Sequence, residues 1–193
     1  MPSPHTQPVG TLTVIPGRAR RLGNDVNTDY IISSRHKKDT LDGNVLRRYL
    51  LEDLDPGFAA TVQDGDILIA GQNFGCGSAM EVAVTVVLAA GIRVVVARSF
   101  ARTYWRNAVN NGLLLITANT DALHEAIREG DHVEVHLTGS RAELHAGEDM
   151  TRVIPCEPVP EIVMTIRDAG GLVPYLRRHG RLMPAPATST SST

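Results

Sequence analysis

The middle of the chain alternates apolar runs with stretches in which apolar residues recur every three or four positions. The apolar runs predict buried strands, and the stretches between them predict helices. The expected strands cover 66–70, 92–97 and 113–117, and the expected helices cover 82–90, 99–111 and 121–129. Strands and helices that alternate in this way are typical of an α/β fold.

The flanks of this region are richer in strands. Residues 11–15 alternate between apolar and polar and predict a first strand, which Pro16-Gly17 should end. A helical rhythm runs over 41–54. Towards the other end, three alternating segments predict a small antiparallel section, and two helices follow it. These last elements are expected at 132–137, 142–145, 151–154, 160–169 and 172–179.

The composition fits one folded domain. The chain has 193 residues, of which 42% are hydrophobic, and this is enough to bury a core. We expect a flexible N-terminal tail over 1–8, the folded domain over 9–179 and a disordered C-terminal tail over 180–193. The net charge is −2 and only 4% of the residues are aromatic, so a nucleic-acid partner is not expected.

The sequence does not indicate a membrane or secreted protein. The longest apolar run, 82–90, is too short to span a bilayer, and the polar N-terminus lacks the apolar core of a signal peptide. Cys76 and Cys156 form neither a disulfide framework nor the paired spacing of a zinc or iron–sulfur site. We therefore expect a cytoplasmic protein.

A glycine-rich loop, residues 71–81, lies between a predicted strand and a predicted helix. Its sequence is Gly-Gln-Asn-Phe-Gly-Cys-Gly-Ser-Ala-Met-Glu, and its glycines permit tight turns and close backbone approach. Ser78 and Glu81 have the spacing of a capping box, and the helix N-terminus favours an anion. Ser78 is therefore either a helix N-cap or, where the same groups stabilise its alkoxide, a base.

Other local motifs are weak. A P-loop would need a lysine after Gly77, and a dinucleotide fingerprint would need a glycine at Met80. His132 and His136 share one face of a predicted strand. They indicate either two ligands of a metal site without an evident third ligand, or a solvated strand face.

Several segments together match a known family. Residues 73–78, Asn-Phe-Gly-Cys-Gly-Ser, are similar to a loop of the aconitase superfamily, and most closely to that of the small subunits of isopropylmalate isomerase and two-subunit homoaconitase. Further segments resemble these subunits in the same order, and the similarity covers roughly 9–178. They are 25–32, 52–58, 91–101, 106–113 and 170–176.

The resemblance implies a swivelling β/β/α domain that closes over a large subunit. The large subunit would carry a [4Fe–4S] cluster, and no cofactor is expected on this chain. The implied enzyme is a hydro-lyase, which removes water from a hydroxy di- or tricarboxylic acid and adds it back at the neighbouring carbon. By residue match, Ser78 would be the base, positioned by capping the helix. Asp29, Gly77 and Ala79 would lie at the substrate.

The loop departs from its family at one position. Ala79-Met80-Glu81-Val82 stands where the family pattern has Ser-Arg-Glu-His. The resemblance implies that this arginine holds a substrate carboxylate, as a bidentate guanidinium can and Met80 cannot. Either another cation reaches the site, the substrate differs, or the usual activity is lost.

Residues 33–39 correspond to the loop whose tip selects the substrate in the family. Arg35 matches a family arginine, while His36, Lys37 and Lys38 replace a more apolar tip. We expect Arg35, Lys37 and Lys38 to bind substrate. An isopropyl group would gain little from such a tip, so a homoaconitate-like acid is favoured over isopropylmalate. The alternative for this segment is a solvated loop.

Two other functions remain open at this point. Since a fold does not guarantee its usual activity, the chain could be a non-catalytic or regulatory interaction subunit. It could also be a domain that binds small anions without a partner.

Overall fold

The computed structural model describes residues 11–38 and 40–181. The tails expected at 1–8 and 180–193 lie outside this part of the chain, apart from residues 180 and 181. The strands are β1 (Leu12–Arg21), β2 (Ile67–Ala70), β3 (Val94–Ala97), β4 (Leu114–Thr117), β5 (His132–Thr138), β6 (Arg141–Ala146) and β7 (Arg152–Pro155). The helices are α1 (Thr28–Ile31), α2 (Gly43–Leu46), α3 (Phe58–Thr61), α4 (Val82–Ala89), α5 (Arg102–Asn111), α6 (Ala122–Ala126), α7 (Glu161–Asp168) and α8 (Leu172–His179), with 3-10 turns η1 (Ser34–Lys37) and η2 (Arg47–Tyr49).

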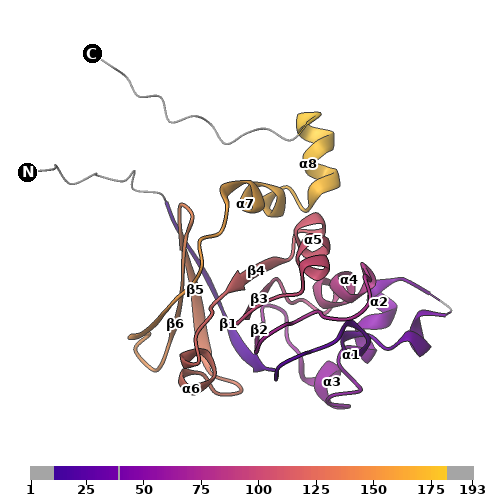
Figure 1. Ribbon diagram of the computed structural model, residues 1–193, viewed down its shortest axis with the longest axis horizontal. Helices are drawn as coiled ribbons and strands as arrows, with labels where there is room; N and C mark the ends of the chain where they lie inside the picture. Colours follow the sequence, from indigo (N-terminus) through magenta and orange to yellow (C-terminus); the bar gives the residue numbers. More distant parts are fainter. Residues whose placement is uncertain (1–10, 39, 182–193) are drawn as a thin grey trace, which may run out of the picture.

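The described strands form one curled sheet in the order β4-β3-β2-β1-β5-β6-β7 (Figure 1). Strands β1 to β4 pair in parallel, and β1, β5, β6 and β7 pair antiparallel. The expected α/β fold and its antiparallel section are therefore both confirmed.

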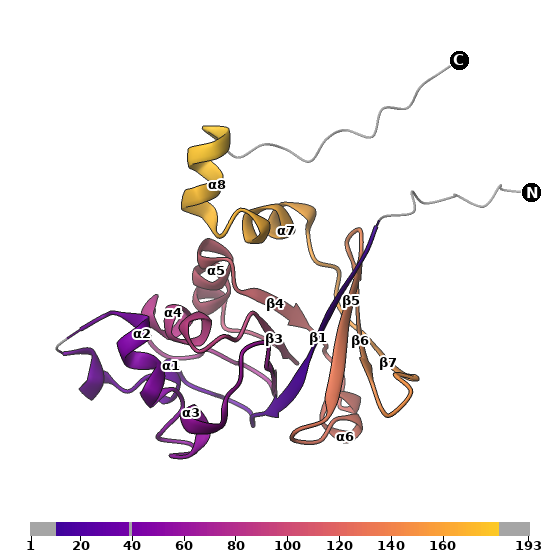
Figure 2. The same ribbon diagram turned by 180° about the vertical axis from the view of Figure 1, so that it is seen from behind.

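Three layers build the core. The antiparallel strands lie at one side, the parallel strands in the middle and helices α1 to α5 at the other side (Figures 1 and 2). Along β2, Ile67 and Ile69 pack in the core shared with the antiparallel strands, whereas Leu68 and Ala70 pack in the core shared with the helices. A strand buried on both faces needs an uninterrupted apolar run, which is why these strands were readable from the sequence. The layering is the β/β/α arrangement that the resemblance implies.

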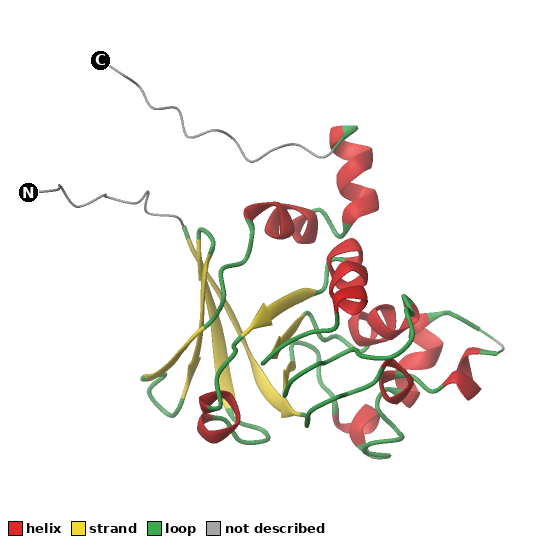
Figure 3. Cartoon of the chain, viewed as in Figure 1, coloured by secondary structure: helices red, strands yellow, loops and turns green. Residues whose placement is uncertain are grey.

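Strand β1 does not end at Pro16-Gly17, and the prediction that it does is wrong. Over its first seven residues β1 pairs with β5, and from Ala19 to Arg21 it pairs with β2. Its other edge is therefore unpaired at Pro16 within the described sheet, where a residue without an N–H is tolerated. By changing partner midway, β1 joins the antiparallel and parallel parts of the sheet (Figure 3).

The helices expected at 41–54, 99–111 and 121–129 are shorter in the structure, and tertiary hydrogen bonds explain this for the first two. The helical rhythm over 41–54 gives only α2 and η2, since the N–H of Leu51 donates to the carbonyl of Ile31. Helix α5 begins at Arg102 rather than at residue 99. The preceding residues are extended against the glycine loop, where the N–H of Phe74 donates to the carbonyl of Ser99.

A buried ion network holds the start of β2 against β1. Asp66 is 2% exposed and accepts hydrogen bonds from Arg18 Nε and Nη2 at 3.0 and 2.8 Å, and from Arg20 Nη1 at 3.3 Å. Arg20 also pairs with Glu129 across the sheet at 2.7 Å. Burial by itself raises the pKa of Asp66, but its hydrogen bonds with Arg18, Gln63 N–H and Arg20 outweigh burial and hold that pKa below its usual value.

Asp66→Asn should lower the free energy of unfolding by about 3 kcal/mol at neutral pH, because it leaves the buried guanidinium of Arg20 and the partly exposed one of Arg18 without their carboxylate. Since the folded-state pKa of Asp66 is depressed, the stability it contributes is present above the unfolded-state pKa of about 3.9 and is lost as pH falls through the folded-state value. Urea unfolding of the whole chain at several pH values measures this. Asp64→Asn, an exposed neighbour, is the control; an equal loss in both variants would contradict the assignment.

Candidate active site

The glycine loop lies where the parallel strands end. It follows β2 and leads into α4, so it belongs to the edge formed by the carboxyl ends of β1 to β4. Ligands of open parallel sheets bind at this edge. The segments that follow β1 and β3 flank the loop on its two sides, through isolated bridges from Asn27 to Cys76 and from Phe74 to Phe100.

Close packing holds the loop in place. Phe74 is fully buried and meets the rings of Tyr104 and Phe100 edge to face, with centroids 5.2 and 6.1 Å apart. Gly77 has φ of +92°, and a Cβ on it would lie 2.6 Å from Asn27 Oδ1. Only glycine fits here, because both the backbone angle and the space exclude a side chain.

The segment after β1 runs beside the loop and is bonded to it. The N–H of Gly75 donates to the Val26 carbonyl at 2.8 Å, and the N–H of Thr28 donates to the Cys76 carbonyl at 2.8 Å. The Thr28 hydroxyl donates to the Ser78 carbonyl at 3.0 Å. These three bonds place Asp29, the next residue, close to the tip of the loop.

Ser78 stands at the tip and is exposed. It is not the N-cap of α4, so the predicted capping box is wrong. Helix α4 starts at Val82 with Glu81 as its cap residue, and the Glu81 carboxylate accepts from Asn111 Nδ2 at 3.2 Å. The reason is tertiary: the carbonyl of Ser78 is bonded to Thr28, which holds this residue on the loop and away from the helix.

The tip is rich in unused hydrogen-bond donors. The backbone N–H groups of Gly77, Ser78 and Ala79 donate to no acceptor among the described residues. They precede the N-terminus of α4, whose dipole also favours negative charge. The arrangement can therefore hold an anion or stabilise an alkoxide on Ser78.

A lysine from the neighbouring loop reaches this tip. The ammonium of Lys37 lies 2.7 Å from Met80 Sδ and 3.2 Å from Asp29 Oδ1. Its side chain is 11% exposed, whereas that of Asp29 is 47% exposed. The sequence singled out Lys37 and Met80 separately, and the structure brings them together.

The other cations of the loop differ in their surroundings. Arg35 is paired with Glu52 at 2.6 Å and with Asp53 at 2.7 Å, and it faces these acids. His36 also contacts Glu52 and stacks on Tyr49, with ring centroids 3.8 Å apart. Although burial raises the pKa of Glu52, its hydrogen bonds with Arg35 and His36 lower it overall.

Like Arg35, Lys38 is an exposed cation of this loop. It makes no ion pair within the described part of the chain. No described acid pairs with the charge of Lys38, whereas Glu52 pairs with Arg35 and contacts His36.

The two cysteines are not suited to thiolate chemistry. Burial, with a contribution from Asp25, raises the pKa of the Cys76 thiol. Burial raises the pKa of the Cys156 thiol to about 12. A thiol with a raised pKa is protonated at neutral pH and is a poor nucleophile or metal ligand.

The described residues also offer no ligand set for a metal. Nowhere in residues 11–38 and 40–181 do three or more His, Cys, Asp or Glu side chains gather in a way that could hold a metal ion. His136, one of the two candidate ligands, stacks on His145 with centroids 3.8 Å apart and lies 2.7 Å from Glu134, and His132 is exposed. A [4Fe–4S] cluster therefore does not fit the residues described here.

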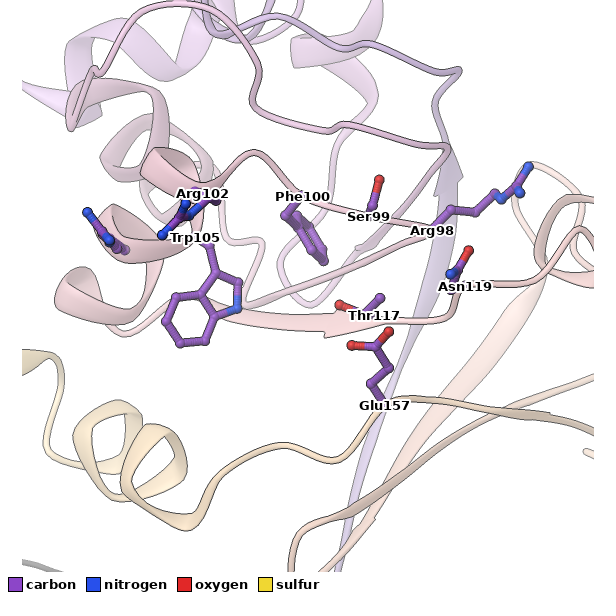
Figure 4. A pocket seen from close by; sticks show the side chains of 9 residues that line it. Arg98, Ser99, Phe100, Arg102, Trp105, Thr117, Asn119 and Glu157 are labelled. Atoms are coloured by element: carbon purple, nitrogen blue, oxygen red, sulfur yellow. The ribbon is translucent and has the colours of Figure 1, made fainter.

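A pocket of about 330 Å³ lies on the same edge as the glycine loop (Figure 4). It adjoins the loop through Ser99, whose hydroxyl oxygen accepts from the N–H of Asn73 at 2.8 Å. Figure 4 shows Arg98 and Arg102 on opposite sides of it. The lining residues are Arg98, Ser99, Phe100, Arg102, Trp105, Arg106, Thr117, Asn119 and Glu157.

The sequence did not single out every residue that builds the site. Asn27 and Thr28 were part of a matched segment, but nothing local showed that they position Gly77 and Ser78. The side chain of Asn27 lies against Gly77, and that of Thr28 bonds to Ser78, which is 50 residues away in the sequence.

Comparisons relate the chain to known proteins. Residues 34–121 match the family described as the aconitase C-terminal domain. The 3-isopropylmalate dehydratase small subunit 1 of Methanopyrus kandleri is 42% identical over 168 residues, which cover 86% of this chain and 95% of that protein. The methanogen homoaconitase small subunit of Methanocaldococcus jannaschii is 40% identical over 165 residues, which cover 86% of this chain and 92% of that protein.

A solved structure agrees with these matches. The crystal structure of 3-isopropylmalate dehydratase from Methanocaldococcus jannaschii superposes with a TM-score of 0.78 and 39% identity. The match covers 87% of this chain and 96% of that chain. Separately, none of the helices within the described ranges is both long enough and apolar enough to cross a membrane.

The close approach of Gly77 to Asn27 can be tested by stability. Gly77→Ala should cost about 3 kcal/mol of unfolding free energy, because it adds a steric clash to backbone strain. Gly130→Ala is the matched control: Gly130 also has a positive φ, of +85°, but nothing lies within 4 Å of an added Cβ. It should cost about 1 kcal/mol. Equal costs in thermal or urea unfolding would show that the contact with Asn27 does not constrain the loop.

Proposed function

Because the chain belongs to the family of 3-isopropylmalate dehydratase small subunits, within the aconitase superfamily, we propose that it is the small subunit of a two-subunit hydro-lyase. The enzyme isomerises or dehydrates a hydroxy di- or tricarboxylic acid. The observation that carries the proposal is the tip of the glycine loop, where Ser78 is exposed, the N–H groups of residues 77–79 donate to no described acceptor, and the ammonium of Lys37 contacts Met80 and Asp29.

We propose Ser78 as the base. Its hydroxyl makes no hydrogen bond within the described residues, so it is free to meet a substrate. The N–H groups of the loop, the dipole of α4 and the nearby ammonium all favour the alkoxide over the neutral hydroxyl. The alkoxide takes the proton from carbon, the C–H electrons form the double bond, and the C–O bond on the neighbouring carbon breaks. The departing hydroxide takes up a proton from solvent and becomes water. Re-addition of water at the other carbon reverses these steps.

We propose that the substrate carboxylates bind along the same tip. The N–H groups of Gly77 and Ala79 and the ammonium of Lys37 supply donors for one carboxylate. Asp29 lies at the edge of the site and orients Lys37. Arg35 acts through its pairs with Glu52 and Asp53, which hold the loop in position.

The polar loop tip supports a substrate with an additional carboxylate. Lys38 is exposed and unpaired in the described part of the chain, so it can meet a further anionic group, whereas an ammonium offers an isopropyl group little apolar contact. We therefore propose a homoaconitate-like acid as substrate, in preference to 3-isopropylmalate.

The partner in this proposal is a large subunit, in the cytoplasm, that carries the [4Fe–4S] cluster. The edge with the glycine loop and the pocket beside Ser99 would face that subunit, since Ser78 is otherwise open to solvent. The functional domain is residues 9–179. A non-catalytic role is not favoured, because the relatives are named as enzyme subunits and because Lys37 supplies a cation beside Met80.

Ser78→Ala tests the base. In the complex reconstituted with its large subunit, kcat should fall by at least about a thousandfold, the contribution expected of a positioned base. The melting temperature should not change, because the Ser78 side chain is exposed. Turnover is followed by the absorbance of the unsaturated acid, with 3-isopropylmalate and homoaconitate as substrates. Ser140→Ala, in an exposed hairpin turn, should retain full activity. A small effect of Ser78→Ala would exclude its role as base.

Lys38→Leu tests the substrate class. The ratio of kcat/KM for homoaconitate to that for 3-isopropylmalate should fall by about tenfold or more, because a charged contact is lost for one acid and an apolar one is gained for the other. Lys38→Arg should keep the ratio of the natural chain. An unchanged ratio in Lys38→Leu would mean that this residue does not select the substrate.

A further inference from the structure

The surroundings of Lys37 are unusual for a lysine. Its side chain is 11% exposed, although lysines are almost never buried unless their charge is paired. Among the residues that the structure describes, the carboxylate paired with it is that of Asp29, which lies at 3.2 Å and is itself half-exposed. The remaining contact is the thioether of Met80, which is only a weak acceptor. An ammonium has three donors, so Lys37 retains capacity for a stronger acceptor.

The loop around Lys37 explains why this charge points inward. Arg35 and His36, its two predecessors, are both held by Glu52, and Arg35 also by Asp53. These pairs and the stacking of His36 on Tyr49 hold η1 in one orientation. The side chain of Lys37, the next residue of η1, is thereby directed towards the glycine loop.

Met80 provides the surface on which the lysine rests. Its side chain is partly buried and packs against the core on the helix side of the sheet. A second cation at 80 would repel Lys37 at contact distance, so only one of the two positions can carry the charge.

We propose that Lys37 and Met80 form a coupled pair that binds one substrate carboxylate: the ammonium of Lys37 supplies the charge, and Met80 leaves room for it. The inference deepens the function proposed above and rests on it. In this proposal Lys37, on the loop after α1, supplies the cation for the carboxylate. The family pattern instead has its arginine at the position of Met80, in the segment that precedes α4. Substrate binding at Ser78 is thereby tied to the position of the same loop that carries Lys38.

The proposal predicts what happens when the positive side chain is removed from position 37 or placed at position 80. Lys37→Met should raise KM for homoaconitate by at least about 30-fold, as expected for the loss of a charged hydrogen bond, with a smaller effect on kcat. Lys37→Arg should remain within about fivefold of the natural chain, since it keeps the charge. Met80→Arg alone should not improve kcat/KM, because it places two cations together.

The double variant Lys37→Met/Met80→Arg is the decisive one. It should recover at least about tenfold in kcat/KM over Lys37→Met, because the charge returns from the other side. Arg141→Met is the control for loss of one positive charge; Arg141 is exposed and starts β6, at the opposite end of β1 from the site. A double variant no better than Lys37→Met would overturn the coupling.

A binding measurement separates this inference from the proposed function. In complexes that carry Ser78→Ala, titration calorimetry with homoaconitate and with 3-isopropylmalate reports affinity without turnover. Adding Lys37→Met should raise the Kd for the acid that binds by at least about 30-fold. Equal affinity with and without Lys37→Met overturns the role of Lys37 and leaves the hydro-lyase intact. If the natural complex neither binds nor turns over either acid, the proposed function itself fails.

Discussion

The contact between the segment after β1 and the glycine loop is the constraint on which the site depends. Three hydrogen bonds join residues 26–28 to residues 75–78, and the missing side chain of Gly77 allows Asn27 to approach. Without this contact, Ser78 would have no fixed position relative to Asp29. Since Asp29 in turn pairs with Lys37, the charge at the tip also depends on it.

Strand β1 makes this contact possible. It pairs with β5 along its first part and with β2 along its end, so both parts of the sheet meet in one strand. The buried Asp66 with Arg18 and Arg20 fixes the start of β2 against it. The segments that leave β1 and β2 therefore emerge side by side, which brings Asn27 to Gly77.

The basic loop shows how a fold divides a run of charges. In sequence, Arg35, His36, Lys37 and Lys38 are equivalent polar neighbours. In the structure Glu52 takes up the first two, Lys37 turns to Asp29 and Met80, and Lys38 stays exposed. Hydrogen bonds with fixed acids, and not the type of residue, decide which charges are available to a ligand.

The sequence by itself determined the central strands and the place of the site. Strands β2 to β4 are buried on both faces and so must be continuous apolar runs, and the loop after β2 carries glycines that its packing requires. The tertiary structure alone decided that β1 continues through Pro16-Gly17 and that Ser78 does not cap α4, because hydrogen bonds from distant segments override these local signals. It also decided the contact between Lys37 and Met80. These residues are 43 positions apart, and no periodicity connects them, since only the packing of η1 against the glycine loop brings them together.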